Sequence, residues 1–205
     1  MKKLVCIIAA AMGIFASASA QKTSDLGAWL NLQATASIGK GGYAVLRGEY
    51  RANNDLKNTE CMFMVLAGGY RFAPWLSADL GYEMWSIGNV LNHKAVLTAT
   101  GTLRRENLAF SLREKYEHTF KPDGSSSPML RSRIRGQYYS EGAFRPYLAA
   151  ELFAWSGWQR ALFYIGTEIS LSKHSTIDVF YCYHMPNGAM PVSTLGLGYY
   201  FNFSL

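Results

Sequence analysis

Apolar and polar residues alternate along most of the chain from Asp25 onward. In the stretch 195–205, apolar or aromatic residues occupy every second position, with Gly, Tyr, Asn and Ser between them. The stretch 76–85 alternates in the same way, with Ser77, Asp79 and Glu83 among the residues opposite the apolar set. A helix cannot gather either apolar set on one side, because its faces repeat every 3.6 residues. The pattern therefore predicts β-strands that have one apolar and one polar face.

Eleven segments carry this pattern, and residues typical of turns separate them. They span residues 26–38, 43–53, 60–72, 76–85, 93–104, 107–118, 129–140, 144–155, 160–171, 176–184 and 195–205. Many reach roughly ten residues, the length of a tilted strand that crosses a bilayer, whereas strands of soluble proteins average about five or six.

Only helices and closed barrels satisfy every backbone group in lipid. The pattern therefore predicts an all-β fold, a transmembrane antiparallel up-and-down β-barrel. A secreted soluble β-domain is the alternative, because alternation does not say which face meets water. Bacterial single-chain barrels have an even number of strands, whereas we count eleven segments. We therefore expect ten to twelve strands, and twelve rather than ten, with one segment divided differently.

Residues 1–20 have the features of a cleaved secretory signal peptide. Lys2-Lys3 precedes an apolar stretch, and Ala18-Ser19-Ala20 forms an A-x-A cleavage site. We expect the mature chain, residues 21–205, to form one barrel domain in the outer membrane of a Gram-negative bacterium. It keeps Cys61 and Cys182, and the sequence leaves open whether they approach each other.

Composition narrows the classes of function. Charged residues make up 17% of the chain, below the roughly 25% of a soluble domain, and aromatic residues make up 14%. The formal net charge of +6 falls to +4 without the two signal-peptide lysines, and it is too diffuse to indicate nucleic acid binding. The expected partners of this predicted monomer are outer-membrane lipid and lipopolysaccharide, and the barrel-assembly machinery during insertion.

The polar face of the predicted strands carries charges of both signs. If the apolar face meets lipid, these charges line the lumen, where a desolvated charge is costly unless it is paired. We therefore predict a lumen-lining network of ion pairs, whose members are Arg47, Glu49, Arg51, Asp79, Glu83, Arg113, Lys115, Glu117, Arg131, Arg133, Arg135, Glu151, Glu168 and Asp178.

Three arginines stand at a spacing of two, which places Arg131, Arg133 and Arg135 on one wall of the barrel. Arg47 and Arg51 add two more arginines on another strand. Rings of Arg or Lys select anions in pores, so one interpretation is an anion-attracting constriction. The other interpretation is a structural ladder, in which the guanidinium groups bond to carboxylates on the same lumen wall. The carboxylates available for such a ladder are Glu49, Asp79, Glu83 and Glu151.

The chain lacks the sequence motifs of known catalytic sites. It has no H-E-x-x-H, G-x-S-x-G or C-x-x-C string and no phosphate-binding glycine loop. We therefore expect no enzyme, no cofactor and no metal site, but a narrow passive channel or a structural barrel. One alternative is an outer-membrane enzyme acting on lipid or lipopolysaccharide, with His118 or His184 as its base. Another is a surface-binding barrel that acts through loops 53–58, 121–128 and 185–191.

Short strings in the early strands carry a family resemblance. They are residues 27–32, Arg47-Gly48-Glu49-Tyr50-Arg51, Gly69-Tyr70-Arg71 and Gly81-Tyr82-Glu83. With these strings the chain resembles domain-of-unknown-function family 2490 over nearly all of the mature sequence. The resemblance implies an outer-membrane β-barrel and implies neither an activity nor catalytic positions. The chain departs from many such barrels in its last residues, because Ser204-Leu205 follows Phe203.

Overall fold

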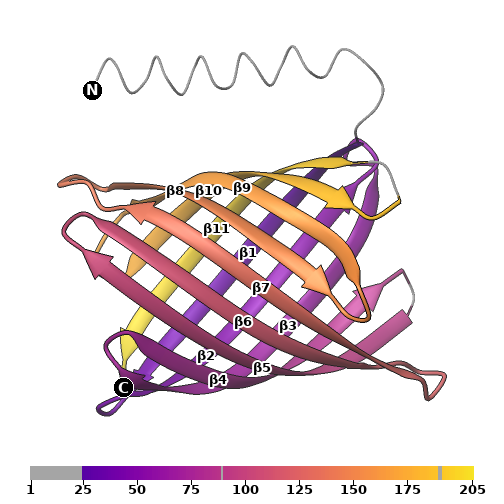
Figure 1. Cartoon of the computed structure of the whole chain (residues 1–205), viewed down its shortest axis with the longest axis horizontal. Helices are drawn as coiled ribbons and strands as arrows, with labels where there is room; N and C mark the ends of the chain where they lie inside the picture. Colours follow the sequence, from indigo (N-terminus) through magenta and orange to yellow (C-terminus); the bar gives the residue numbers. More distant parts are fainter. Residues whose placement is uncertain (1–24, 89, 189–190) are drawn as a thin grey trace.

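Each predicted segment forms a strand in the computed structural model, which describes residues 25–88, 90–188 and 191–205 (Figure 1). The predicted signal peptide lies outside these residues. Consecutive strands pair antiparallel around one closed sheet. The strands are β1 (Asp25–Ile38), β2 (Gly42–Asn53), β3 (Asn58–Ala73), β4 (Leu76–Ile87), β5 (Val90–Arg105), β6 (Leu108–Phe120), β7 (Ser126–Tyr138), β8 (Phe144–Ala154), β9 (Trp158–Ser170), β10 (Ser175–Pro186) and β11 (Val192–Ser204).

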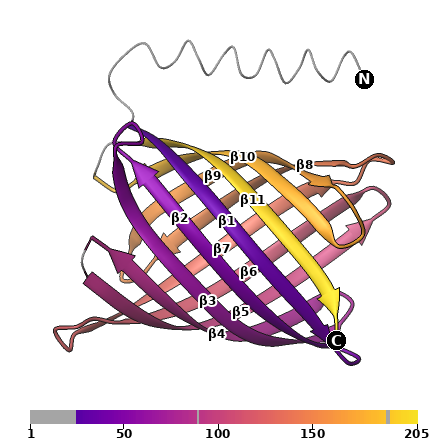
Figure 2. The same ribbon diagram turned by 180° about the vertical axis from the view of Figure 1, so that it is seen from behind.

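The barrel closes through a parallel pair, β1 with β11, which lie side by side in Figure 2. Its register runs from Asp25 opposite Val192 to Ser37 opposite Ser204. The expectation of an even strand number is therefore wrong for the described residues, which form eleven strands. Each turn reverses the chain direction, so the first and eleventh strands point the same way. A parallel ladder still pairs the backbone groups of both edges, so the closed sheet exposes no edge.

Several connections differ in length from the predicted ones. The predicted strands leave residues 86–92 between them, whereas β4 continues to Ile87 and pairs there with Val90 of β5. Apolar Val90 and Leu91 extend the ladder toward the turn. The connection between β7 and β8 comprises residues 139–143, whereas the predicted strands leave only residues 141–143 between them.

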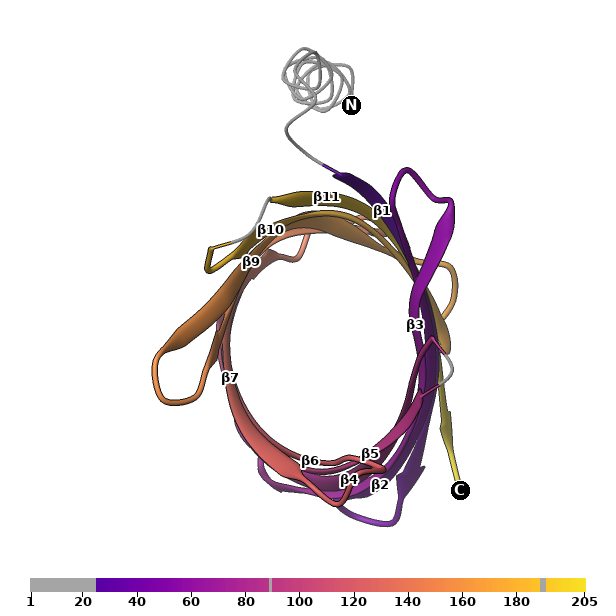
Figure 3. The same cartoon turned by 90° about the vertical axis from the view of Figure 1, so that its right-hand side faces the viewer.

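The wall of the barrel has an apolar outer face. Leucines such as Leu66 and Leu103 point outward and are more than 60% exposed. Glu114 of β6 is an outward-facing exception, and its carboxylate accepts a hydrogen bond from the Ser132 hydroxyl of β7 at 2.6 Å. Among the described residues, no helix is long and apolar enough to cross a membrane. Viewed along its axis, the sheet forms a closed oval ring (Figure 3).

Aromatic rings on the inner face pack over glycines of the neighbouring strand. A Cβ atom added to Gly196 of β11 would lie 2.0 Å from the ring of Phe180, and one added to Gly69 of β3 would lie 2.3 Å from the ring of Tyr43. Any larger residue at these two positions would displace the ring. The glycines therefore allow large rings to lie flat against the inner wall, and these rings narrow the lumen.

Candidate lumen site

A cavity of about 460 Å³ lies in the lumen and collects most of the predicted network. Twelve of the fourteen predicted residues line it; Asp79 and Glu117 do not. Its lining carries eight cationic side chains against five acidic ones, an excess of three positive charges. The cationic members are Arg47, Arg51, Arg113, Lys115, Arg131, Arg133, Arg135 and Arg145, and the acidic members are Glu49, Glu83, Glu151, Glu168 and Asp178.

Glu151 of β8 is one acidic centre of the site. Its carboxylate accepts hydrogen bonds from Arg113 at 2.8 Å, Arg131 at 3.0 Å and the Tyr164 hydroxyl at 3.2 Å. The Glu151 side chain is almost fully buried. Charge-assisted bonds of this kind offset the loss of hydration that burial imposes on a carboxylate.

A second group of charges runs along the wall from β4 to β7. The ammonium group of Lys115 lies 2.6 Å from Glu83 and 2.8 Å from Glu117. Glu117 also binds Lys94 at 3.0 Å and Arg131 at 2.6 Å. Glu83 and Glu117 thus form ion pairs with Lys94, Lys115 and Arg131. Each of these charges has a partner of opposite sign.

The remaining predicted acids have separate partners. Glu49 pairs with Arg51 at 2.5 Å, and Glu168 pairs with Arg135 at 2.7 Å. Asp178 accepts a bond from the Tyr147 hydroxyl at 3.0 Å. Asp79, outside the cavity lining, accepts a bond from the Tyr43 hydroxyl at 3.2 Å.

The three arginines on the β7 wall do not behave alike. Arg131 is paired with Glu117 and Glu151, and Arg135 with Glu168. Of the other acids proposed for a ladder, Glu49 binds Arg51, Glu83 lies 3.7 Å from Arg47, and Asp79 makes no ion pair with a described residue. Arg133 makes no ion pair with any described residue; its guanidinium group lies 4.7 Å from the centre of the Tyr164 ring. Arg47 is also weakly held, at 3.7 Å from Glu83.

A continuous ring of contacts encircles the lumen through nine residues, one from each of β1 to β9. We call these residues the lumen belt: Trp29, Arg51, Phe63, Trp85, Lys94, Glu117, Arg131, Glu151 and Tyr164. The guanidinium group of Arg51 lies 3.9 Å from the Trp29 ring, and the Lys94 ammonium group lies 3.8 Å from the Trp85 ring.

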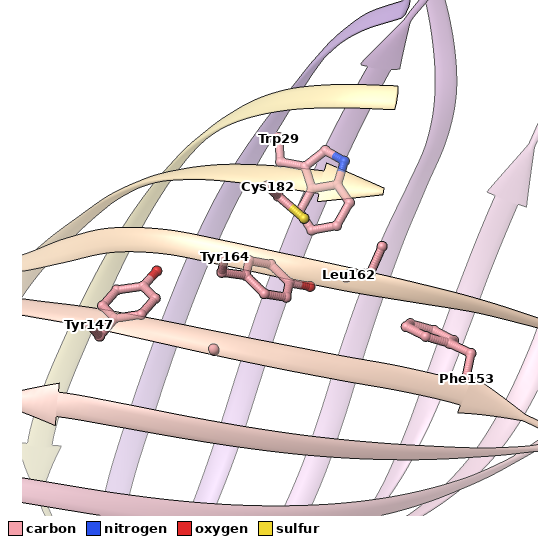
Figure 4. Packing of buried hydrophobic residues seen from close by; sticks show 7 residues of the cluster. Trp29, Tyr147, Phe153, Leu162, Tyr164 and Cys182 are labelled. Atoms are coloured by element: carbon pink, nitrogen blue, oxygen red, sulfur yellow. The ribbon is translucent and has the colours of Figure 1, made fainter. Parts of the chain in front are cut away.

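The contact between Trp29 of β1 and Tyr164 of β9 completes the lumen belt, although β10 and β11 lie between these two strands in the sheet. The centres of the two rings lie 6.4 Å apart. Figure 4 shows both residues within the buried cluster that joins β1 to β8, β9 and β10. Seven of the nine belt residues are buried, so their side chains narrow the lumen at this level.

The sequence alone does not reveal the lumen belt. All five tryptophans lie near the ends of predicted strands, where amphipathic rings are expected at the lipid headgroups. Trp29 and Trp85 instead face inward and are buried, whereas Trp75, Trp155 and Trp158 are exposed. The signal was present in the alternation: Trp29 stands two residues before Asn31, and Trp85 two residues after Glu83, on the polar face.

The two histidines considered as catalytic bases lie in different surroundings. His118 faces outward, where its Nδ1 atom lies 3.1 Å from the Tyr116 hydroxyl. His184 faces inward, where its Nε2 atom lies 3.2 Å from the Thr194 hydroxyl. Neither ring contacts a carboxylate of a described residue. No group of three or more metal-ligating side chains occurs within the part of the chain that the structure describes.

The closed sheet, its apolar outer face and its charged lumen define an up-and-down β-barrel. Residues 26–192 match the model of the family described as Protein of unknown function (DUF2490), and the chain belongs to this family. The resemblance drawn from the sequence is thereby confirmed.

A solved structure described as the NanC porin in a rhombohedral crystal form is similar in fold. The two chains are 12% identical, the match covers 82% of this chain and 93% of that one, and the TM-score is 0.54. At this identity the likeness concerns the fold. None of the curated proteins compared with the chain matches it.

Proposed function

We propose that this protein is a non-enzymatic barrel of the Gram-negative outer membrane that conducts small anions through a narrow lumen. The apolar outer face and strands of 11 to 16 residues support a membrane location. The predicted signal peptide agrees with export, and membership in a family of unknown function neither adds nor excludes an activity.

The positive excess of the cavity lining carries the proposal. Eight cationic side chains against five acidic ones leave a positive field inside a low-dielectric wall, which concentrates anions and repels cations. Rings of Arg and Lys set anion selectivity in pores by this effect. The lumen belt is the proposed constriction, and its buried side chains would exclude all but small solutes.

A structural barrel with a closed lumen is the second candidate. It is favoured by the nine ion pairs among the described residues and by the burial of the lumen belt. Interiors of eight-stranded barrels are filled by side chains, whereas barrels of about 16 strands hold water channels, so eleven strands lie between these cases.

Single-channel recording in a planar bilayer separates the two candidates. We expect the refolded barrel to open in small steps and to show an anion-preferring reversal potential in a KCl gradient. The double variant Arg47→Gln with Arg133→Gln removes two of the three excess charges and breaks no ion pair shorter than 3.7 Å. Its reversal potential should shift toward zero.

The control variant is Arg104→Gln, which removes an exposed arginine outside the cavity lining and should leave the reversal potential unchanged. Silence from a barrel whose folding is proven by heat-modifiable gel mobility would contradict the channel. If Trp29→Ala then produced openings, the lumen belt would be a seal and the structural candidate would replace the channel.

A further inference from the structure

Buried polar atoms without a partner concentrate in one place. In the described residues six buried side-chain nitrogen or oxygen atoms lack a hydrogen-bond partner, and every one belongs to a residue that lines the lumen cavity. Five of the six are N–H donors: Trp29 Nε1 and the Nε atoms of Arg47, Arg113, Arg133 and Arg135. Unpaired buried donors are costly, so this concentration favours an acceptor in the cavity, which is either water or a solute.

These donors approach the cavity from two opposite walls. Arg113 and Arg133 are register partners on β6 and β7, and Arg135 follows on β7. Arg47 lies on β2, which the strand order places nearly opposite β7 in the ring of eleven. An acceptor in the cavity would therefore be held from both sides.

The acidic side chains of the cavity pair with three arginines of this group and leave Arg133 without an ion pair among the described residues. Glu151 and Glu168 bind Arg113, Arg131 and Arg135, and no described carboxylate pairs with Arg133. The nearby tyrosine hydroxyls donate to carboxylates, Tyr147 and Tyr200 to Asp178 and Tyr164 to Glu151, and none of them accepts a hydrogen bond from Arg133. Arg133 thus keeps its charge and its donors for a ligand.

We infer that the cavity is a binding site for a small soluble oxyanion, a carboxylate- or phosphate-bearing solute held between Arg133 and Arg47. Guanidinium groups bind both oxyanions with paired N–H donors. The cavity volume of about 460 Å³ is within the range of small-molecule sites, roughly 300–1,000 Å³. The ligand reaches the site from water, because the cavity lies in the lumen and not on the apolar outer face. The inference deepens the proposed function, since the bound oxyanion belongs to the class of solute that the lumen would pass.

Equilibrium binding to the full barrel in a neutral, phosphate-free detergent tests the site. Isothermal titration with inorganic phosphate, and separately with benzoate, at constant chloride should give saturable binding. The tighter of the two probes identifies which oxyanion the site prefers. Arg133→Gln should weaken binding about tenfold or more, because it removes a charge-assisted contact. Arg104→Gln, a matched loss of charge outside the cavity lining, should bind like the parent.

Heat-modifiable gel mobility establishes that each variant is folded before titration. The inference is overturned if neither probe saturates the folded parent, or if Arg133→Gln binds as tightly as the parent. An equal loss in Arg104→Gln would also overturn it, because general charge attraction would then explain the binding. The titration does not depend on conduction. Saturable binding to a barrel that shows no channel openings would refute the proposed channel and support the binding site. Conduction without saturable binding would support the channel and refute the binding site.

Discussion

Replacing Glu151 by glutamine would remove the acidic centre shared by Arg113 and Arg131 without changing the side-chain size. Glu151 is 2% exposed, and its carboxylate lies 2.8 Å from Arg113 and 2.9 Å from Arg131. Removing one partner of a buried ion pair costs about 3–5 kcal/mol, because the other charge stays buried without compensation. The Arg113 side chain is 26% exposed to the lumen, and Arg131 keeps its bond to Glu117. Because of both effects, we expect Glu151→Gln to lower the free energy of unfolding by about 3 kcal/mol, the lower end of this range.

Urea unfolding of the barrel in lipid vesicles, followed by tryptophan fluorescence, measures this loss. With a slope of about 2 kcal/mol per molar urea, Glu151→Gln should unfold at roughly 1.5 M less urea than the parent. Glu106→Gln is the control, because Glu106 is an exposed turn residue, and its midpoint should not move. If the Glu151→Gln midpoint stayed within about 0.3 M of the parent, the ion pairs of the lumen would not stabilise the barrel.

Three further results are expected. Glu114→Leu should raise the free energy of unfolding in vesicles by about 1 kcal/mol, because a carboxylate on a lipid-facing wall is unfavourable; an unchanged or lower value would argue against lipid contact there. Gly196→Ala should destabilise the barrel by about 1–3 kcal/mol through overpacking, whereas Gly48→Ala, with open space around its Cβ, should be neutral in the same urea titration. Cys61 and Cys182 are free and buried, so a maleimide reagent should modify them in urea but not in the folded barrel, as read by mass spectrometry; rapid labelling of the folded form would contradict the burial.

The alternation of apolar and polar residues predicted the strands. Successive side chains of a strand point to opposite faces, and here one face is apolar and the other polar. The strand count also followed from the alternation, and it was the general preference for even numbers that led away from it. No local pattern reveals whether the first and last strands pair parallel, since that depends on how the whole sheet closes.

The inward charges were predictable one by one, whereas their pairing was not. Arg113 bonds to Glu151 across the intervening strand β7, and Lys115 bonds to Glu83 across β5. Such partners depend on the tilt and stagger of the strands, which a single strand's sequence does not encode. The unpaired state of Arg133 has the same origin, because its register partner on β8 is Glu151, and the carboxylate of Glu151 binds Arg113 and Arg131 instead.

The parallel pairing of β1 with β11 also restricts how the chain could be rewired. The start of β1 and the end of β11 lie at opposite rims, so no tight turn can join them as it could in a barrel with both ends at one rim. A circular permutant would need a linker as long as the wall, about 13 residues for a strand of this length. Inside the barrel that linker would meet the lumen belt, and outside it would carry unpaired backbone groups into lipid. The order of the strands around the barrel is therefore tied to the seam between β1 and β11.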